Sequence, residues 1–306
     1  MRAIEVELTD WEYYRDYGRL LLPAARYIEW KGRRYFVTMA LGRNMRICRR
    51  RLLLLVLASS TVLLAFQRDG FPPWQFEDAP TEAHEKAEFT FGRLRFAASG
   101  GSWGGWRRMG WSEDFPKADR QFMEGVRRLT RIDGRSTEKV LDLDSDEIFN
   151  WPWIYAVNVG RWDFTEAQAK RMREYLLRGG FLVADNFHGA AEWETFLAGM
   201  HKVFPDRQVE DLKNTDEIFH VLYDLDERFQ IPGYQYIWTG RTYERDGIEP
   251  HWRAIRDDKG RILVAICHNM HLGDAWEHAD DPRYPERFSS LAYRLGINYI
   301  VYGMTH

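Results

Sequence analysis

The chain has 306 residues, of which 45% are hydrophobic and 15% aromatic, enough to bury one large core or two smaller ones. Residues 1–66 hold 12 of the 43 Lys and Arg and 6 of the 46 Asp and Glu, so residues 67–306 carry 31 basic against 40 acidic residues, a net charge of −9. An acidic domain is a poor candidate for nucleic-acid binding, which demands a basic surface, and we expect no such partner.

Residues 45–66 have the layout of a secretory signal. Four arginines between Met45 and Leu52 precede fifteen apolar or small residues, Leu52 to Phe66. As a helix this run spans roughly 22 Å, short of the roughly 30 Å hydrocarbon core of a bilayer. A signal peptide is therefore favoured, and an N-terminal membrane anchor is the alternative. We expect an exported protein, periplasmic or membrane-anchored, that touches the membrane only through residues 45–66.

The segments on either side of this run follow from that interpretation. A signal peptide normally starts a protein, so residues 1–44 are interpreted as an overextended gene model, or else as a short segment ahead of a membrane span. Residues 27–37 have the pattern of a hairpin. Residues 67–87 are rich in Pro and charge and indicate a linker, so the domain begins near Glu88.

Hydrophobic periodicity then predicts alternating strands and helices. A capping box at Thr165 and Gln168 marks the start of one helix, and Gly179-Gly180 marks its end. The predicted order is a strand over 89–97, a helix over 116–132, strands over 139–143 and 153–159, a helix over 165–178, a strand over 181–185, a helix over 189–204, a β-rich insertion, a hairpin over 252–268 joined at 258–260, and a helix over 285–302. Such alternation is typical of a three-layer α/β/α sandwich with a mainly parallel sheet. No G-x-G-x-x-G or P-loop motif follows any predicted strand.

Several segments resemble one bacterial family. These are "FTFGRLRF", "WPWIYAVNVGRWDFTEAQAKRMREYLLRGGFLVADNFHG", "VFPDRQVEDLKNTDEIFHVLYDL" and "RLGINYIVYGMTH". Over residues 88–306 they are similar to the family catalogued as domain of unknown function 4159. The resemblance implies a class I glutamine amidotransferase-like, flavodoxin-like fold in an exported or membrane-attached protein. It implies no particular activity.

Glutaminase chemistry is not expected from these residues. Amidotransferases of this fold carry a Cys on a sharp turn between strand and helix, but the corresponding turn, 184–189, reads "ADNFHG" and has no Cys or Ser. Cys267 ends the apolar run "ILVAIC" and is interpreted as a buried core residue. Cys48 is the only other thiol, which leaves the exported part without an intramolecular disulfide.

The turn after "FLVAD" supplies the first candidate site. Asp185, Asn186 and His188 lie where a parallel strand ends and a helix begins, which is where open α/β sheets bind ligands. We predict Asp185 and His188 as candidate catalytic residues, with Asp185 orienting His188, and Asn186 as a ligand-binding residue. The alternative is that Asp185 and Asn186 only cap the turn and His188 is exposed.

The segment "CHNMHLGDAWEHADD" supplies the second. His268, His271, Asp274 and Glu277, followed by His278, are spaced three to four residues apart along the chain and have side chains suited to a divalent metal. A polar loop without metal is the alternative, because no zinc-protease motif is present and Gly273 interrupts a helix. If the strand ending at Cys267 pairs parallel with "FLVAD", its end should approach Asp185.

Aromatic and basic residues form the third candidate set. Trp103 and Trp106 lie in a Gly-rich loop that could stack on sugar rings or fold over its own indoles. Arg93 is interpreted either as a ligand contact or as a salt-bridge partner at the edge of the core. Trp276 completes the predicted ligand-binding residues.

Three functions are compatible with these features. The leading one is an exported domain that binds a polar ligand, a carbohydrate or cell-envelope component, at the carboxyl ends of its strands. The second is a metal-assisted hydrolase using Asp185 and His188. The third is a non-catalytic module that binds protein partners in an envelope complex.

Overall fold

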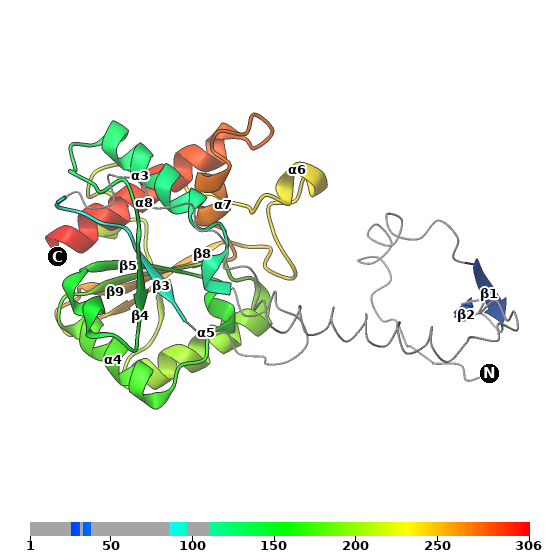
Figure 1. Cartoon of the computed structure of the whole chain (residues 1–306), viewed down its shortest axis with the longest axis horizontal. Coiled ribbons are helices and arrows are strands. Elements are labelled where there is room, and N and C mark those ends of the chain that lie inside the picture. Colours follow the sequence, from blue (N-terminus) through cyan, green and yellow to red (C-terminus); the bar gives the residue numbers. More distant parts are fainter. Residues whose placement is uncertain (1–25, 31–32, 38–85, 97–109) are drawn as a thin grey trace, which may run out of the picture. The chain divides into compact units, whose positions relative to one another are not determined.

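A computed structural model describes residues 26–30, 33–37, 86–96 and 110–306 (Figure 1). The chain forms two compact units, Met1–Pro73 and Trp74–His306. In the first unit, β1 (Arg26–Trp30) and β2 (Arg33–Val37) pair antiparallel, which confirms the predicted hairpin. The apolar run 45–66, the linker up to residue 85 and the Trp-rich loop 97–109 lie outside the described residues. Within the described ranges, no helix is long and apolar enough to cross a membrane.

The second unit contains a seven-stranded sheet in the order β4-β3-β5-β6-β9-β8-β7. Five strands, from β4 to β9 in this order, run parallel to their neighbours, and β8 and β7 are added antiparallel at one edge. The predicted mainly parallel α/β sheet is confirmed. The strands are β3 (Gly92–Arg95), β4 (Lys139–Asp142), β5 (Trp153–Val157), β6 (Phe181–Asp185), β7 (Glu210–Asp211), β8 (His251–Arg256) and β9 (Ile262–His268).

Helices cover both faces of the sheet (Figure 1). Side chains alternate along β5, so that Trp153 and Tyr155 pack under one layer of helices and Ile154 and Ala156 under the other. Because both faces are buried, strands such as β6 consist of apolar residues without alternation. One layer contains α3 (Lys117–Leu129), α7 (Leu272–Glu277) and α8 (Glu286–Thr305), and the other contains α4 (Glu166–Leu177) and α5 (Gly189–Val203).

The capping box predicted for α4 is present with both of its hydrogen bonds. The Gln168 amide donates to Thr165 Oγ1, and the Thr165 amide donates to Gln168 Oε1. Gly179, at a φ of +113°, ends the helix in a backbone conformation that disfavours other residues. Because these local signals set where α4 begins and ends, they also set where β6 begins and where its carboxyl end lies.

Two predictions for the second half of the domain are wrong. The insertion after α5 is not β-rich: apart from the two residues of β7 it holds the single turn η6 (Glu217–Phe219) and the short helix α6 (Tyr236–Thr239). The polar segment after β9 is helical, since α7 buries Leu272, Ala275 and Trp276 against the sheet.

Short 3-10 turns also follow β4 and β5, at η4 (Asp146–Asn150) and η5 (Val159–Arg161).

Candidate functional site

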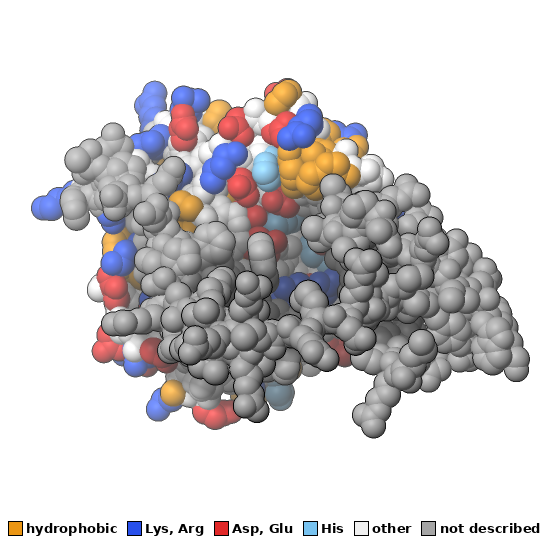
Figure 2. Space-filling model, turned by 45° about the vertical axis from the view of Figure 1, so that its right-hand side comes forward, with side chains coloured by type: hydrophobic (Ala, Val, Ile, Leu, Met, Phe, Trp, Pro, Cys, Tyr) orange, Lys and Arg blue, Asp and Glu red, His pale blue; other side chains and the backbone are white. Residues whose placement is uncertain are grey.

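The carboxyl ends of β5, β6 and β9 meet at one edge of the sheet, because these strands are parallel neighbours. Acidic and histidine side chains gather on the face shown in Figure 2. Four segments supply them: the residues that precede α3, the end of β6, the residues that follow β9, and the insertion after α5. We call the following set the strand-end cluster: Asp114, Asp185, His188, Glu244, His271 and Asp274.

Asp185 joins β6 to the segment after β9. Its Oδ2 accepts hydrogen bonds from the Tyr155 hydroxyl at 2.5 Å and from the amides of Leu272 at 2.8 Å and Gly273 at 3.2 Å. This confirms that the end of β9 approaches Asp185. Burial raises the pKa of Asp185, although the charge of His271 and the Tyr155 hydrogen bond oppose the shift. Its Oδ1 is also buried and has no hydrogen-bond partner among the described residues.

His188 is buried, so the expectation of an exposed side chain at this position is wrong. Its Nε2 lies 3.1 Å from Asn186 Oδ1 and 3.8 Å from Glu244 Oε1. Asn186, not Asp185 as we predicted, therefore orients the ring. Burial, joined by the charges of His271 and Arg245, lowers the pKa of His188 to about 3, which makes the imidazole neutral. Within the described part of the chain, its Nδ1 has no hydrogen-bond partner.

Asn186 has both ends of its side-chain amide engaged. Its φ of 52° lies in the left-handed region that Asn tolerates better than most residues. The Oδ1 atom faces His188, and Nδ2 donates to Glu113 Oε2 at 3.1 Å. Asn158, at the end of β5, donates to the same carboxylate. Asn186 thus holds the side chains of His188 and Glu113 in position, and a ligand could bind the Asn186 amide only by displacing one of them.

The centre of the cluster is a histidine held between two carboxylates. His271 Nε2 lies 2.7 Å from Asp114 Oδ2, and His271 Nδ1 lies 2.9 Å from Asp274 Oδ2. Burial by itself lowers the pKa of His271, but Asp274 and Asp114 outweigh it and raise the pKa well above its ordinary value. Burial also raises the pKa of Asp114, whereas His271 outweighs burial and lowers the pKa of Asp274. His271 is therefore the cationic member of the cluster, held between two acidic side chains.

Sequence reasoning missed Asp114 and Glu244. Asp114 lies between β3 and α3, and its φ of 62° belongs to a turn that no sequence motif marks. Glu244 comes from the insertion and reaches the cluster only through tertiary folding. The acidic pair in "WSEDFP", directly before the predicted helix over 116–132, is the one signal in the sequence for Asp114.

Three of the four predicted metal ligands, His271, Asp274 and Glu277, lie in two overlapping groups of possible ligands. The ligand atoms of Asp114, His271 and Asp274 lie within 4.8 Å of one another, and a second group joins Asp274 to Glu277 and His278. Since both ring nitrogens of His271 face carboxylates, an ion bound there would displace a proton and one of these contacts.

His268 lies apart from these two groups. Its ring stacks on Phe187 and Trp193, at 4.9 and 4.8 Å between ring centroids. As the last residue of β9 it shares a face with Ile266, toward α5, because strand side chains alternate.

The remaining ligand-binding candidates have different positions. Arg93 is fully buried and donates to both oxygens of Asp119, so the salt-bridge interpretation is the one observed. Trp276 is also fully buried and stacks on Phe122 at 4.2 Å, in the core beneath α3 and not at the surface. Trp103 and Trp106 lie outside the described residues. Cys267 is buried beside Tyr299, as expected for a core thiol, and burial raises its pKa well above the ordinary value.

The N-terminus of α5 has little capacity left for an anion. The Gly189 amide donates to Asn269 Oδ1 at 2.8 Å and the Ala190 amide donates to Asp246 Oδ2 at 3.1 Å. Both amides were expected to favour an anionic or polar ligand, but side chains of the protein already satisfy them. The site is therefore an acidic one.

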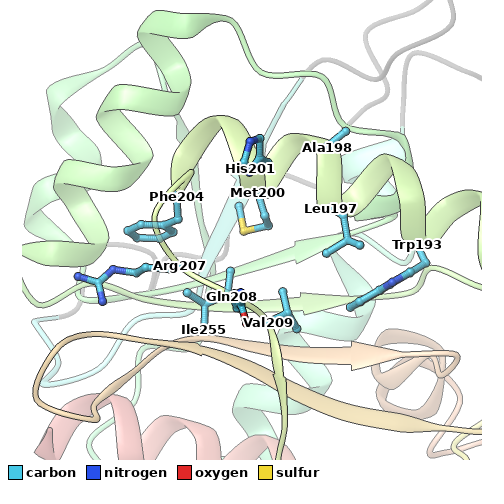
Figure 3. Close-up of a pocket in the computed structure, with 10 residues that line it drawn as sticks. All are labelled: Trp193, Leu197, Ala198, Met200, His201, Phe204, Arg207, Gln208, Val209 and Ile255. Atoms are coloured by element: carbon cyan, nitrogen blue, oxygen red, sulfur yellow. The ribbon is translucent and has the colours of Figure 1, made fainter.

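A separate cleft of about 590 Å³ lies between α5 and the strand β8 (Figure 3). Trp193, Phe204 and Ile255 are among the residues that line it, and Arg207 is at one end. It shares no residue with the strand-end cluster and lacks paired carboxylates, so its chemistry is that of an apolar contact surface.

No curated protein matches this chain. Residues 91–304, which include every member of the strand-end cluster, match the family described as Domain of unknown function (DUF4159). This match spans well over half of the chain and confirms the resemblance seen in the sequence. The protein belongs to the DUF4159 family.

Proposed function

We propose that the strand-end cluster binds a neutral, hydroxyl-rich ligand such as a carbohydrate. The observation that carries the proposal is a pair of buried polar atoms, Asp185 Oδ1 and His188 Nδ1, that have no hydrogen-bond partner among the described residues. Buried polar atoms are nearly always hydrogen-bonded, and two exceptions in one strand end call for a missing partner. Hydroxyl groups suit them, because each hydroxyl both donates and accepts.

The charge of the cluster decides which polar ligands fit. It contains four carboxylate side chains and one strongly basic histidine, and burial raises the pKa of Glu244 as well. An anionic ligand would meet four acidic groups and only one cationic histidine, so it would be repelled by the ionised acids and would have to keep the others protonated. A neutral sugar therefore suits the site better than a phosphorylated or acidic one.

Isothermal titration calorimetry of the full chain tests this proposal. Neutral monosaccharides and oligosaccharides should bind, and the variant Glu244→Gln should weaken binding at least about tenfold, because it replaces a charged hydrogen-bond acceptor. Glu244 is partly exposed, so this change should leave the fold intact. Asp258→Asn is the matched control, since its side chain is 91% exposed and remote from the cluster. The proposal fails if no neutral sugar binds, or if both variants bind as the native chain does.

A second function, metal-assisted hydrolysis, is supported by the donor set of Asp114, His271 and Asp274. One imidazole and two carboxylates suit a divalent ion that activates water. The native chain loaded with Zn²⁺ or Mn²⁺ should then retain one ion, and Asp274→Asn should lose it. His268→Gln should retain it, because His268 lies outside the group. A native chain that holds no ion would exclude this function.

The fold is compatible with both proposed functions, carbohydrate binding and metal-assisted hydrolysis. The parallel strands follow the order 2-1-3-4-5 when numbered from β3, which is the order of flavodoxin-like sheets, and we propose that class for the domain, including its amidotransferase-like branch. In such sheets the ligand site lies beyond the carboxyl ends of the strands. The thiol required for glutaminase chemistry is not among the cluster residues, and Cys267 is buried in the core.

We also propose, from residues 45–66 of the sequence alone, that the protein is exported or membrane-anchored and acts in the cell envelope. Cell fractionation combined with N-terminal sequencing tests this. Recovery of the native protein in the cytoplasm with residues 1–44 attached would contradict it. If binding to sugars fails, a role as a protein-interaction module remains as the alternative.

A further inference from the structure

The segment Ile231–Gly247, which we call the strand-end loop, is closed at its base by Gln230, and its first residue is bonded to the segment after β9. Gln230 Nε2 donates to the carbonyl of Gly247 at 2.9 Å and to that of Asn269 at 2.8 Å. The His271 amide donates to the Ile231 carbonyl at 2.9 Å. The loop is thus closed at its base and tied to the segment that carries the central histidine of the cluster.

The loop lies directly against the carboxylates of the cluster. The Tyr234 amide donates to Asp274 Oδ2 at 2.6 Å. Gly233 lies against these carboxylates, because a Cβ atom there would be 2.8 Å from Asp274 Oδ2 and 2.9 Å from Glu244 Oε1 and would displace them. The backbone of the loop therefore forms part of the wall of the site.

The same loop presents a large aromatic ring to solvent. Trp238, in α6, has 70% of its surface exposed, and α6 stands out from the body of the domain (Figure 1). A single exposed Trp is by itself unremarkable in a soluble protein. Trp238, however, packs edge-on against Tyr234, with 4.9 Å between ring centroids.

Tyr234 in turn is held from three sides. It stacks on His278 at 3.7 Å between ring centroids, and its hydroxyl donates to Asp281 at 2.6 Å. Its amide is the one that binds Asp274. A supported row of rings, Trp238, Tyr234 and His278, therefore leads from the solvent to the carboxylate of Asp274.

We propose that Trp238 is a stacking platform for one sugar ring of a neutral oligosaccharide, whose neighbouring unit occupies the strand-end cluster; this rests on the proposed carbohydrate binding. The flat face of an indole favours the apolar C–H face of a pyranose ring. Because Tyr234 already holds the Trp238 side chain in place, binding costs little side-chain entropy. The carboxylates alongside bind hydroxyls and repel anions. Because platform and cluster are separate, the platform should matter for oligosaccharides and not for monosaccharides.

Calorimetry with glucose, N-acetylglucosamine, cellotetraose and chitotetraose tests this inference on the full chain. Trp238→Ala should weaken binding of the tetrasaccharide that the native chain prefers by about tenfold, Trp238→Phe should weaken it less, and monosaccharide affinity should not change. Ile248→Ala is the matched control, an exposed apolar side chain of the same insertion with 65% of its surface exposed. Circular dichroism checks that each variant is folded.

The outcomes separate this inference from the proposed function. If the native chain binds a tetrasaccharide and Trp238→Ala binds it equally well, the platform is wrong while carbohydrate binding stands. If none of the four sugars binds the native chain, both proposals are wrong. If sedimentation shows that the native chain self-associates and Trp238→Ala does not, Trp238 belongs to a contact between copies and the platform is again wrong.

Discussion

At the scale of single residues, Arg93 and Asp119 form an ion pair whose two side chains are fully buried. Burial raises the pKa of Asp119 to about 6, although Arg93 opposes this shift. Replacement of Arg93 by Met should lower the free energy of unfolding by about 3–5 kcal/mol, because it leaves a buried acid without its partner. Urea denaturation at neutral pH measures this loss. The double variant Arg93→Met with Asp119→Leu should recover most of it.

The neighbouring ion pair on the same strand is the control for this prediction. Arg95 pairs with Asp142, but their side chains are 50% and 36% exposed. Arg95→Met should therefore change the free energy of unfolding by less than about 1 kcal/mol. Equal losses for Arg93→Met and Arg95→Met would contradict the role assigned to burial.

The buried His188 should make the free energy of unfolding fall as the pH falls. Its folded-state pKa of about 3 is lower than that of the unfolded chain, near 6.5, so between these values the unfolded state binds a proton that the folded state does not. The free energy of unfolding therefore falls as the pH falls from 6.5. This group contributes a loss of about 2–3 kcal/mol between pH 6.5 and 4.5.

The variant His188→Gln should show a correspondingly smaller loss of stability on acidification, measured by urea denaturation at both pH values. His201→Gln, an exposed position on α5, is the control and should retain the native pH dependence. Identical pH profiles for the native chain and His188→Gln would contradict the burial of a neutral imidazole.

At the scale of elements, α4 depends on a cap that is visible in the sequence. Thr165→Ala removes the hydroxyl that accepts from the Gln168 amide and should destabilise the domain by about 1 kcal/mol, measured by thermal unfolding. Thr195→Ala is a matched change within α5, where the hydroxyl only bonds the Ala191 carbonyl of the preceding turn. It should change stability by less than about 0.5 kcal/mol. A similar loss for both variants would show that capping is not the cause.

Elements differ in how far they can be predicted. The strands and long helices were predictable, because their periodicity and caps are local. The end of β9 was correctly expected beside Asp185, since parallel neighbours end at the same edge. The insertion was mispredicted because side chains far apart in sequence hold it, as when Gln230 bonds both Gly247 and Asn269.

At the scale of the whole molecule, the candidate site is assembled from segments more than a hundred residues apart. Asp114 and His271 are 157 positions apart in the chain, yet their side chains are in contact. His268 and His271 are three residues apart, yet they point to different surroundings. Spacing along the chain therefore grouped three of the four predicted metal ligands correctly as neighbours, but it missed Asp114 and wrongly included His268.

The sequence by itself determined the alternation of strands and helices, the acidic charge of residues 67–306, the family and the approach of the end of β9 to Asp185. These depend on local periodicity, composition and the shared edge of parallel strands. Only the tertiary structure decided that Asp114 and Glu244 join the cluster, that Arg93 and Trp276 belong to the core, and that Trp238 is exposed beside the site. Burial and long-range contacts decide such roles, because a side chain takes its pKa and its partners from whatever the fold packs around it.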